Sequence, residues 1–354
     1  MLVKIFTFAF GVFLVSANFI YASENNLRSV HRHGDRNARF SYPNDPNLNN
    51  WLTLGLGAVT EPGEKRMETL GQYFRKRYNT FWNPKKDIYV RTSRLDRCVK
   101  SVQNLITGAY NEYFLANPVP VESVQFEVDN MLNPMSKCPA FDNEFLRVLN
   151  LPENLKWFNS IKPLILYIAK YCGPSCVTNV ETFFNVFDNL KISKLNNWTL
   201  PNWVTEDIYN QFETANNRIF VLFGYSTLQQ RLTAGTFLNE LKNQMNLIQS
   251  YKKFDKLRIY STQDIQISSI LRSLDVFNEI APPFGTTIIF EFYQNFFPRE
   301  EFFRIYYLND TYSQHPYPLV LKSCKENEHC SFTKLNNQIE NLIPDDWRKE
   351  CGLK

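Results

Sequence analysis

The sequence predicts an α/β domain that carries a smaller, mostly helical lobe. Strand-like and helix-like segments alternate near both ends of the 354-residue chain, whereas the middle third shows long helical patterns interrupted by proline. Apolar residues make up 44% of the chain and aromatic residues 15%, so the chain can bury a large core and is not intrinsically disordered.

Strands and helices alternate in the first third of the chain. The apolar run at 27–31 predicts a strand that ends in a polar loop. An amphipathic helix is predicted over 60–82, followed by a strand over 87–91 and a second helix. Apolar side chains mark one face of each helix: Met67, Leu70, Phe74, Tyr78 and Phe81 in the first, and Val99, Val102, Leu105, Ile106 and Ala109 in the second.

The same alternation returns near the C-terminus. A strand is predicted over 257–260 and a helix after it, with Ile267, Ile270, Leu271 and Leu274 on its apolar face. Residues 287–293 and 302–307 resemble a pair of strands. We therefore assign 23–137 and 236–354 to the α/β core, and 138–235 to the helical lobe.

Residues 1–22 are predicted to be a signal peptide. Lys4 precedes an apolar run over 5–15, and small residues follow it. This run is too short to span a bilayer, and the C-terminus carries no hydrophobic anchor signal. A buried first strand is the alternative. We expect a secreted protein that does not associate with membranes.

The chain has seven cysteines, which in an oxidising compartment predicts three disulfides and one free thiol. The segments 172–176 and 324–330 are turn-rich and could each be closed by a short-loop bridge. Zinc binding is the rival interpretation, but the four histidines have no finger-like spacing with these pairs, so we expect no metal or other cofactor. The cysteines are Cys98, Cys138, Cys172, Cys176, Cys324, Cys330 and Cys351.

Two further surface features accompany the secretory signal. Asn197-Trp-Thr199 and Asn309-Asp-Thr311 are predicted N-glycosylation sites. The net charge is +4, from 39 basic and 35 acidic residues, without a basic stripe, so nucleic acid is not an expected partner.

Three predicted strands end in unusual polar segments. These segments are Arg32-His33-Gly34-Asp35-Arg36, Arg94-Leu-Asp96-Arg97 and Thr262-Gln263-Asp264. Sites in open α/β sheets gather beyond the carboxyl ends of the strands, so neighbouring strands would bring these segments to one place.

Such a cluster suits a phosphate group. Arg32, Arg36 and Arg97 could grip its oxygens, because a guanidinium binds oxyanions in a bidentate fork. His33 could attack phosphorus, and Gly34 would let the backbone approach closely. A basic loop with a capping histidine is the alternative, and Asp264 could simply be a helix N-cap.

These motifs resemble the histidine acid phosphatases of the prostatic and lysosomal type. The resemblance runs from about residue 27 to 351. It includes the segments 90–97 and 260–264, Leu200-Pro-Asn-Trp203, Thr205-Glu-Asp207, His315-Pro-Tyr-Pro318 and Ile343-Pro-Asp-Asp-Trp347. It implies a histidine-phosphatase (phosphoglycerate-mutase-like) fold, with a central mixed sheet flanked by helices.

The resemblance also implies residue roles. His33 would be the phosphorylated nucleophile, Arg32, Arg36 and Arg97 would bind phosphate, and Asp264 would protonate the leaving oxygen. The implied disulfides join Cys138 to Cys351 and Cys324 to Cys330. With those assigned, Cys172 and Cys176 remain as the third pair, and Cys98 stays free and buried.

The sequence departs from this family at one position that bears on catalysis. Gln263 stands where the family has the histidine of a His-Asp pair, and Asn37-Ala38 lacks the usual proline. Glutamine can donate a hydrogen bond but carries no positive charge. Losing one such electrostatic donor typically slows a reaction about a hundred- to a thousandfold. We expect a disabled active site.

A substituted His-Asp motif in a small secreted form resembles the flea salivary acid-phosphatase-like proteins. That likeness implies a scavenger of host mediators, namely biogenic amines such as serotonin, and leukotrienes. The alternatives are a working acid phosphatase that uses Gln263, and a module that binds another phosphorylated or sulphated ligand. The protein could be a monomer or a homodimer.

Either kind of mediator needs particular contacts. An ammonium group needs a carboxylate, for which Asp264 is the first candidate and Asp35 the second, with Gln263 beside them. Its ring needs aromatic walls, and a leukotriene would place its carboxylate on Arg36 and Arg97. The candidate walls are Phe183, Phe187, Phe40 and Tyr42, each of which could instead be an ordinary core residue.

Overall fold

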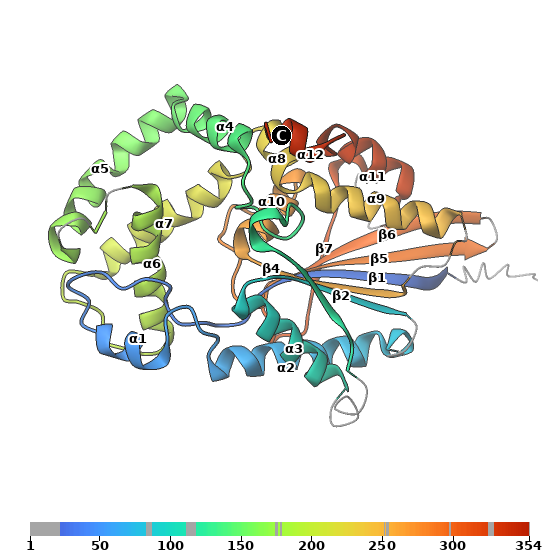
Figure 1. Cartoon of the computed structure of the whole chain (residues 1–354), viewed down its shortest axis with the longest axis horizontal. Coiled ribbons are helices and arrows are strands. Elements are labelled where there is room, and N and C mark those ends of the chain that lie inside the picture. Colours follow the sequence, from blue (N-terminus) through green and yellow to red (C-terminus); the bar gives the residue numbers. More distant parts are fainter. Residues whose placement is uncertain are drawn as a thin grey trace, which may run out of the picture.

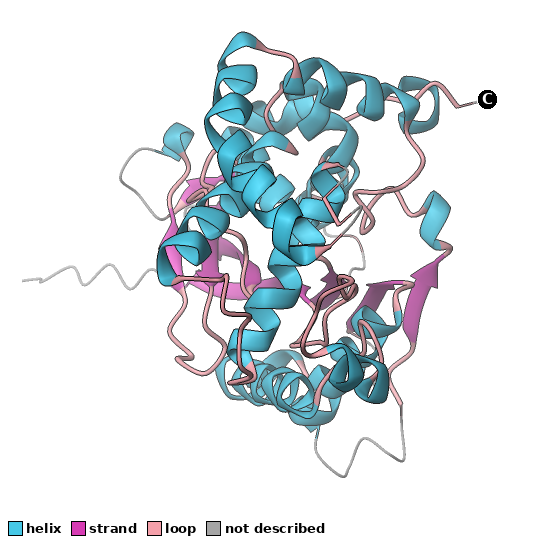
Figure 2. Cartoon of the chain, turned by 90° about the vertical axis from the view of Figure 1, so that its left-hand side faces the viewer, coloured by secondary structure: helices cyan, strands magenta, loops and turns pink. Residues whose placement is uncertain are grey.

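A central sheet with helices on both faces forms the larger part of the molecule, and a group of helices extends from one end of it (Figure 1). The computed structural model describes residues 22–82, 87–110, 118–173, 176–177, 179–250, 252, 255–296, 299–324 and 329–353. Turned by 90°, the helical group lies in front of the strands (Figure 2).

The described residues form an eight-stranded mixed sheet in the order β3-β2-β4-β1-β5-β6-β7, with β8 paired to β6. The strands β1, β2, β3 and β4 run parallel, and β5, β6, β7 and β8 are joined by antiparallel pairings. The strands are β1 (Ala22–Arg32), β2 (Ile88–Ser93), β3 (Val121–Val124), β4 (Leu257–Thr262), β5 (Thr287–Phe296), β6 (Arg299–Leu308), β7 (Tyr317–Leu319) and β8 (Cys330–Ser331).

Helices cover both faces of this sheet. α2 (Glu61–Arg77) and α3 (Asp96–Tyr110) pack on one face, and α9 (Gly235–Gln249), α10 (Asp264–Ser273) and α11 (Phe332–Ile339) pack on the other. Glycine lets α2 and α3 approach closely, because a Cβ at Gly71 would collide with the backbone of Leu105. The short α1 (Leu48–Leu54) and α12 (Trp347–Glu350) lie outside these two layers (Figure 1).

The helical lobe contains α4 (Pro139–Leu149), α5 (Pro152–Cys172), α6 (Val180–Leu195), α7 (Glu206–Leu222) and α8 (Thr227–Thr233). Its apolar core gathers Phe183, Phe187 and Phe212 from α6 and α7, with Leu164 and Ile168 from α5. The predicted helical segment is confirmed, while its independence as a domain stays a prediction.

The predicted α/β elements are confirmed, with shifted ends. The first strand is longer than the predicted 27–31, and the helix predicted over 60–82 ends at Arg77, before the 3₁₀ turn Asn79–Phe81. The predicted signal peptide lies outside the described residues, apart from Ala22, which begins β1. Within the part of the chain that the structure describes, no helix combines the length and apolar composition that a bilayer crossing requires.

All three predicted disulfides are present: Cys138–Cys351, Cys172–Cys176 and Cys324–Cys330. Cys98 is free and buried, as expected. The first bridge ties the start of the helical lobe to the C-terminal segment across 213 residues of sequence. Asn197 and Asn309 are both exposed, as glycosylation requires, and their modification stays a prediction.

Candidate active site

The sheet topology brings the three polar segments together. Arg32 at the end of β1 pairs with Thr262 at the end of β4, and Thr92 near the end of β2 pairs with Ser261. Because the three strands are parallel neighbours, their carboxyl ends meet at one edge of the sheet, beside the N-termini of α3 and α10. His33 interacts electrostatically with Arg32, Arg36 and Arg97. Asp264 interacts with the same three arginines, so these residues form one cluster.

His33 lies at the centre of this cluster and is only 1% exposed. Its backbone N–H donates to the carbonyl of Thr262 at 3.0 Å, which fixes the loop to β4. Its Nδ1 is 2.9 Å from the carbonyl of Gly34, so Nδ1 carries the proton and Nε2 keeps its lone pair. Burial, followed by the charges of Arg32, Arg36 and Arg97, holds the pKa of His33 well below its usual value. The imidazole is therefore a neutral potential nucleophile.

Arg32 is held by three groups of the protein. Its guanidinium donates to the carbonyl of Pro282 at 2.6 Å and forms an ion pair with Asp264 at 2.7 Å. It also lies over the ring of Phe284, 4.1 Å from the ring centroid. The guanidinium nitrogens that would bind a phosphate are therefore already engaged by the carbonyl of Pro282 and the carboxylate of Asp264.

Arg36 makes a bidentate ion pair with a residue of the helical lobe. Its two terminal nitrogens lie 2.8 and 3.0 Å from the two carboxylate oxygens of Asp188 on α6. The side chain of Arg36 is 4% exposed and that of Asp188 21%. Burial would raise the pKa of the Asp188 carboxyl, but the charge and hydrogen bonds of Arg36 outweigh burial and lower it.

Arg97 faces Gln263, which by the resemblance described above takes the place of a histidine. A terminal nitrogen of Arg97 donates to the amide oxygen of Gln263 at 2.9 Å, and the buried amide nitrogen Nε2 has no partner among the described residues. Burial lowers the pKa of Arg97 to about 10. Cys98 next to it donates to the carbonyl of Thr262, and burial raises its pKa to about 12.

Asp264 is the first residue of α10, and Gln263 is the N-cap, without a side-chain capping bond. The carboxylate accepts from its neighbour's backbone N–H at 2.9 Å, and a helix N-terminus favours negative charge. Burial would raise the pKa of this carboxyl, but the charges of Arg32, Arg36 and Arg39 outweigh it and lower the pKa. Asp264 is therefore ionised at neutral pH.

Several residues predicted for the site have other roles in the structure. Asp35 is paired with Arg66 of α2 at 2.5 Å. Gly34 allows a close approach of the backbone to Gly63 of α2, because a Cβ at Gly34 would lie 2.5 Å from the carbonyl oxygen of Gly63.

The predicted aromatic walls contribute to the core of the lobe. Phe183 and Phe187 are 3% and 1% exposed and pack on Phe212, with ring centroids 4.4 and 5.1 Å apart. Tyr42 is also buried, and Phe40 is half-buried against the same core. Side chains this buried offer little surface to a ligand, so their contact with one stays a prediction.

Three residues near the cluster were missed by sequence reasoning: Asp188, Lys191 and Phe284. Asp188 and Lys191 lie three residues apart on α6 and so share a face, in a helix from which the sequence analysis drew only aromatic candidates, Phe183 and Phe187. Phe284 lies in the Pro-Pro-Phe-Gly turn and is 8% exposed, with its ring 5.7 Å from that of His33. Burial and the charge of Arg32 lower the pKa of Lys191.

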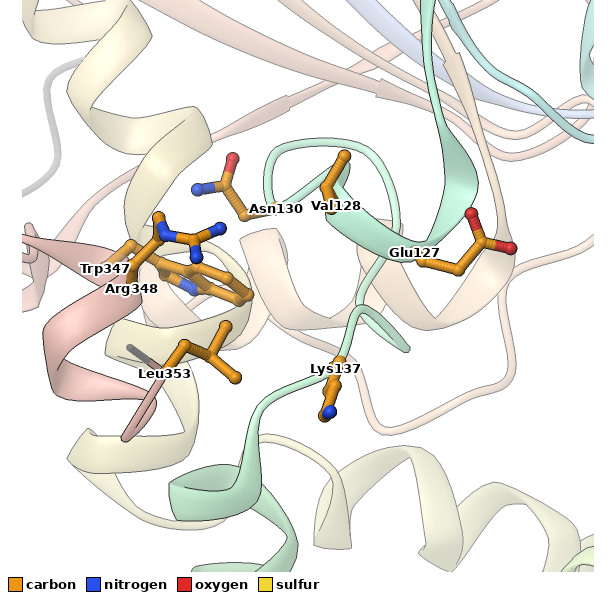
Figure 3. A pocket seen from close by; sticks show the side chains of 7 residues that line it. All are labelled: Glu127, Val128, Asn130, Lys137, Trp347, Arg348 and Leu353. Atoms are coloured by element: carbon orange, nitrogen blue, oxygen red, sulfur yellow. The ribbon is translucent and has the colours of Figure 1, made fainter.

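A separate pocket of about 380 Å³ contains none of the predicted site residues (Figure 3). It lies between the segment preceding α4 and the C-terminal segment, which the Cys138–Cys351 disulfide joins. Among the described residues, no group of three or more His, Cys, Asp or Glu side chains is arranged to hold a metal ion. The pocket is lined by Glu127, Val128, Asn130, Lys137, Trp347, Arg348 and Leu353.

Comparisons with known proteins agree with this geometry. The family model described as histidine phosphatase superfamily (branch 2) matches residues 25–308. Prostatic acid phosphatase of Homo sapiens is 30% identical over 337 residues, which cover 91% of this chain and 86% of that protein. Lysosomal acid phosphatase of Rattus norvegicus is 29% identical over 342 residues, which cover 92% of this chain and 79% of that protein.

Solved structures support the same fold. The phytase from Citrobacter braakii superposes with a TM-score of 0.67 at 15% identity, covering 93% of this chain and 99% of that one. Klebsiella sp. ASR1 phytase gives a TM-score of 0.67 at 14% identity, covering 93% and 97%. These likenesses confirm the predicted family and fold. The chain belongs to branch 2 of the histidine phosphatase superfamily, as a homologue of the prostatic and lysosomal acid phosphatases.

Proposed function

We propose that this acid-phosphatase homologue is a secreted binding protein with little hydrolytic activity, which sequesters biogenic amines of the serotonin type and leukotrienes. The observation that carries the proposal is the state of the catalytic groups. Arg32, Arg36 and Arg97 are each engaged by an acceptor of the protein itself, and the expected proton donor Asp264 is ion-paired.

The loss of activity has a chemical basis in this arrangement. A general acid must hold a proton near the working pH, whereas the pKa of Asp264 is lowered. Gln263 provides no positive charge for the transferring phosphoryl group, and its amide oxygen accepts from Arg97. Both features slow the transfer of phosphate to His33 and the departure of the alcohol.

The same groups can bind an amine. Asp264 and Asp188 are each about one-fifth exposed on their side chains, at 22% and 21%, and a carboxylate oxygen can accept more than one hydrogen bond. Phe284 supplies an aromatic face at the cluster. A leukotriene carboxylate would bind instead to Arg97 and to the unpartnered Nε2 of Gln263.

The extracellular setting rests on the sequence. The three disulfides are typical of an oxidising compartment, and the predicted signal peptide and the two exposed sequons agree with secretion. The place in saliva, and the effect of countering haemostasis and inflammation during blood feeding, follow from the resemblance to the flea salivary proteins.

A weakly active acid phosphatase is the second candidate, and the geometry of His33 favours it. Its Nε2 is unprotonated, and all three arginines surround it. Hydrolysis of an aryl phosphate from about pH 4 to 8 separates the two candidates, with His33→Ala as the control for contaminating activity. We expect turnover close to that of the control.

Calorimetric titration of serotonin completes the test. We expect heat that saturates at one ligand per chain. Robust His33-dependent turnover, or the absence of heat with serotonin and with other biogenic amines, would overturn the proposal.

A further inference from the structure

We propose that the pocket between the loop over 126–137 and the C-terminal segment binds a small carboxylate with an apolar body, such as a medium-chain fatty acid. This inference goes beyond the proposed function, because the pocket contains none of the residues clustered around His33. Its volume of about 380 Å³ lies within the range of small-molecule sites, about 300–1,000 Å³. Figure 3 shows side chains of both segments lining it.

One wall of the pocket is a loop that its own hydrogen bonds hold closed. At its two ends, the backbone N–H of Lys137 donates to the carbonyl of Glu127 at 3.4 Å. Inside the loop, the fully buried Asp129 accepts from the backbone N–H groups of two following residues and pairs with Arg91 at 2.7 Å. This wall is therefore already ordered, which lowers the entropic cost of binding a ligand.

The opposite wall is formed by α12 and the residues after it, and it is also held by hydrogen bonds. The indole N–H of Trp347 donates to the carbonyl of Leu232 at 2.8 Å. The backbone N–H of Leu353 donates to the carbonyl of Arg348 at 2.9 Å and closes the turn after the helix. A disulfide joins this wall to the residue that follows the loop. The pocket is therefore preformed.

The pocket offers apolar surface to a ligand from both walls. Val128 is 51% exposed on the loop, and Leu353 is half-buried on the C-terminal segment. Trp347, which is 8% exposed, contributes to the same lining. Covering these side chains removes apolar surface from water, which favours a ligand with an apolar body.

The charges around this apolar surface favour an anion. Lys137 and Arg348 are cationic, whereas Glu127 is the one acidic side chain among the described residues of the lining. Figure 3 shows the carboxylate of Glu127 directed away from the other lining side chains. Lys137 is exposed. A carboxylate of the ligand can therefore pair with Lys137 while its chain covers Val128 and Leu353.

Calorimetric titration of the full chain with decanoate tests the inference. Saturating inorganic phosphate is present throughout, so that it competes for the arginines around His33. We expect one decanoate to bind per chain, and acetate, which has the same head group without the apolar chain, to bind at least tenfold more weakly. No binding of decanoate, or equal affinities for the two carboxylates, would overturn the inference.

Two variants locate the site, and both change exposed side chains, so the fold should be retained. Lys137→Glu reverses the charge and Val128→Asp places a charge on the apolar surface, and each should lower decanoate affinity at least tenfold. Lys349→Glu and Val124→Asp are the matched controls, because both residues are exposed and lie outside the lining, and each should change the affinity less than twofold. Wild-type affinity in either of the two pocket variants would overturn the inference.

The outcomes separate this inference from the proposed function. Lys137→Glu should leave serotonin binding unchanged, since the pocket and the cluster around His33 share no residue. A wild-type protein that binds decanoate but not serotonin would contradict the proposed function and leave this inference in place. The reverse result would overturn this inference alone.

Discussion

The two sides of the candidate site differ in what they contribute. The sheet edge supplies His33 and three arginines, which are suited to a phosphate, whereas α6 of the helical lobe supplies one carboxylate and one amine, Asp188 and Lys191. Asp188 pairs with Arg36 and so neutralises one of the arginines. The difference teaches that the charge of the site depends on both parts of the molecule and not on the strand-end segments alone.

The largest expected effect concerns the packing that holds α6 in place. Phe212 is fully buried between Phe183 and Phe187, so Phe212→Ala should lower the free energy of unfolding by about 3–5 kcal/mol. Equilibrium unfolding in urea measures this loss. Phe184→Ala, at a half-buried ring of α6, should cost less. A loss below about 1 kcal/mol in Phe212→Ala would contradict its place at the centre of the lobe core.

On the sheet side, Gln263→His should restore phosphatase chemistry. A cationic donor beside the phosphoryl group should raise kcat/KM for an aryl phosphate about a hundred- to a thousandfold, or roughly 3–4 kcal/mol. The gain should vanish in Gln263→His/His33→Ala if His33 is the nucleophile, as the resemblance implies. A gain below tenfold would show that the engaged arginines and Asp264, rather than Gln263, limit the reaction.

An effect that is smaller per pH unit is expected from the buried histidines of β1 and its loop. Burial lowers the pKa of His31 to about 4, and that of His33 is also lowered. The unfolded state, with a pKa near 6.5, takes up the proton first, so stability falls as pH falls from about 6.5 to about 4. The slope should be about 1.4 kcal/mol per pH unit for each histidine.

Urea unfolding at several pH values measures this slope, and His31→Asn should reduce it. The pKa values of Asp188 and Asp264 are lowered, so both carboxylates contribute their full stability above the unfolded pKa of about 3.9. That contribution is lost only as the pH falls below this value, outside the range in which the histidines titrate. An unchanged slope in His31→Asn would show that folding does not lower the pKa of this histidine.

Sequence reasoning predicted the sheet side of the site well and the lobe side poorly. Polar residues at strand ends stand out against apolar runs, and the parallel order of β2, β4 and β1 makes such ends neighbours. Asp188 gave no such signal, because it lies in a Phe-rich helix, and Phe284 gave none because it lies in a turn of the α/β core. The position of Asp188 at the cluster depends on how the lobe packs against the sheet edge, which no local pattern encodes.

The same limit applies to Phe183 and Phe187, for which the sequence leaves a pocket wall and an ordinary core position both open. The structure places both rings in the core of the lobe. Asp35 likewise belongs to the motif that carries His33, yet its carboxylate points to Arg66 of α2.

The most direct test of the account is a titration of serotonin in the absence and presence of saturating inorganic phosphate. If the family's catalytic cluster has become a mediator-binding site, serotonin binds once per chain and phosphate suppresses that binding. Serotonin binding that phosphate leaves unchanged would show that the amine binds outside the cluster around His33. No serotonin binding at all would contradict the proposed sequestration of amines.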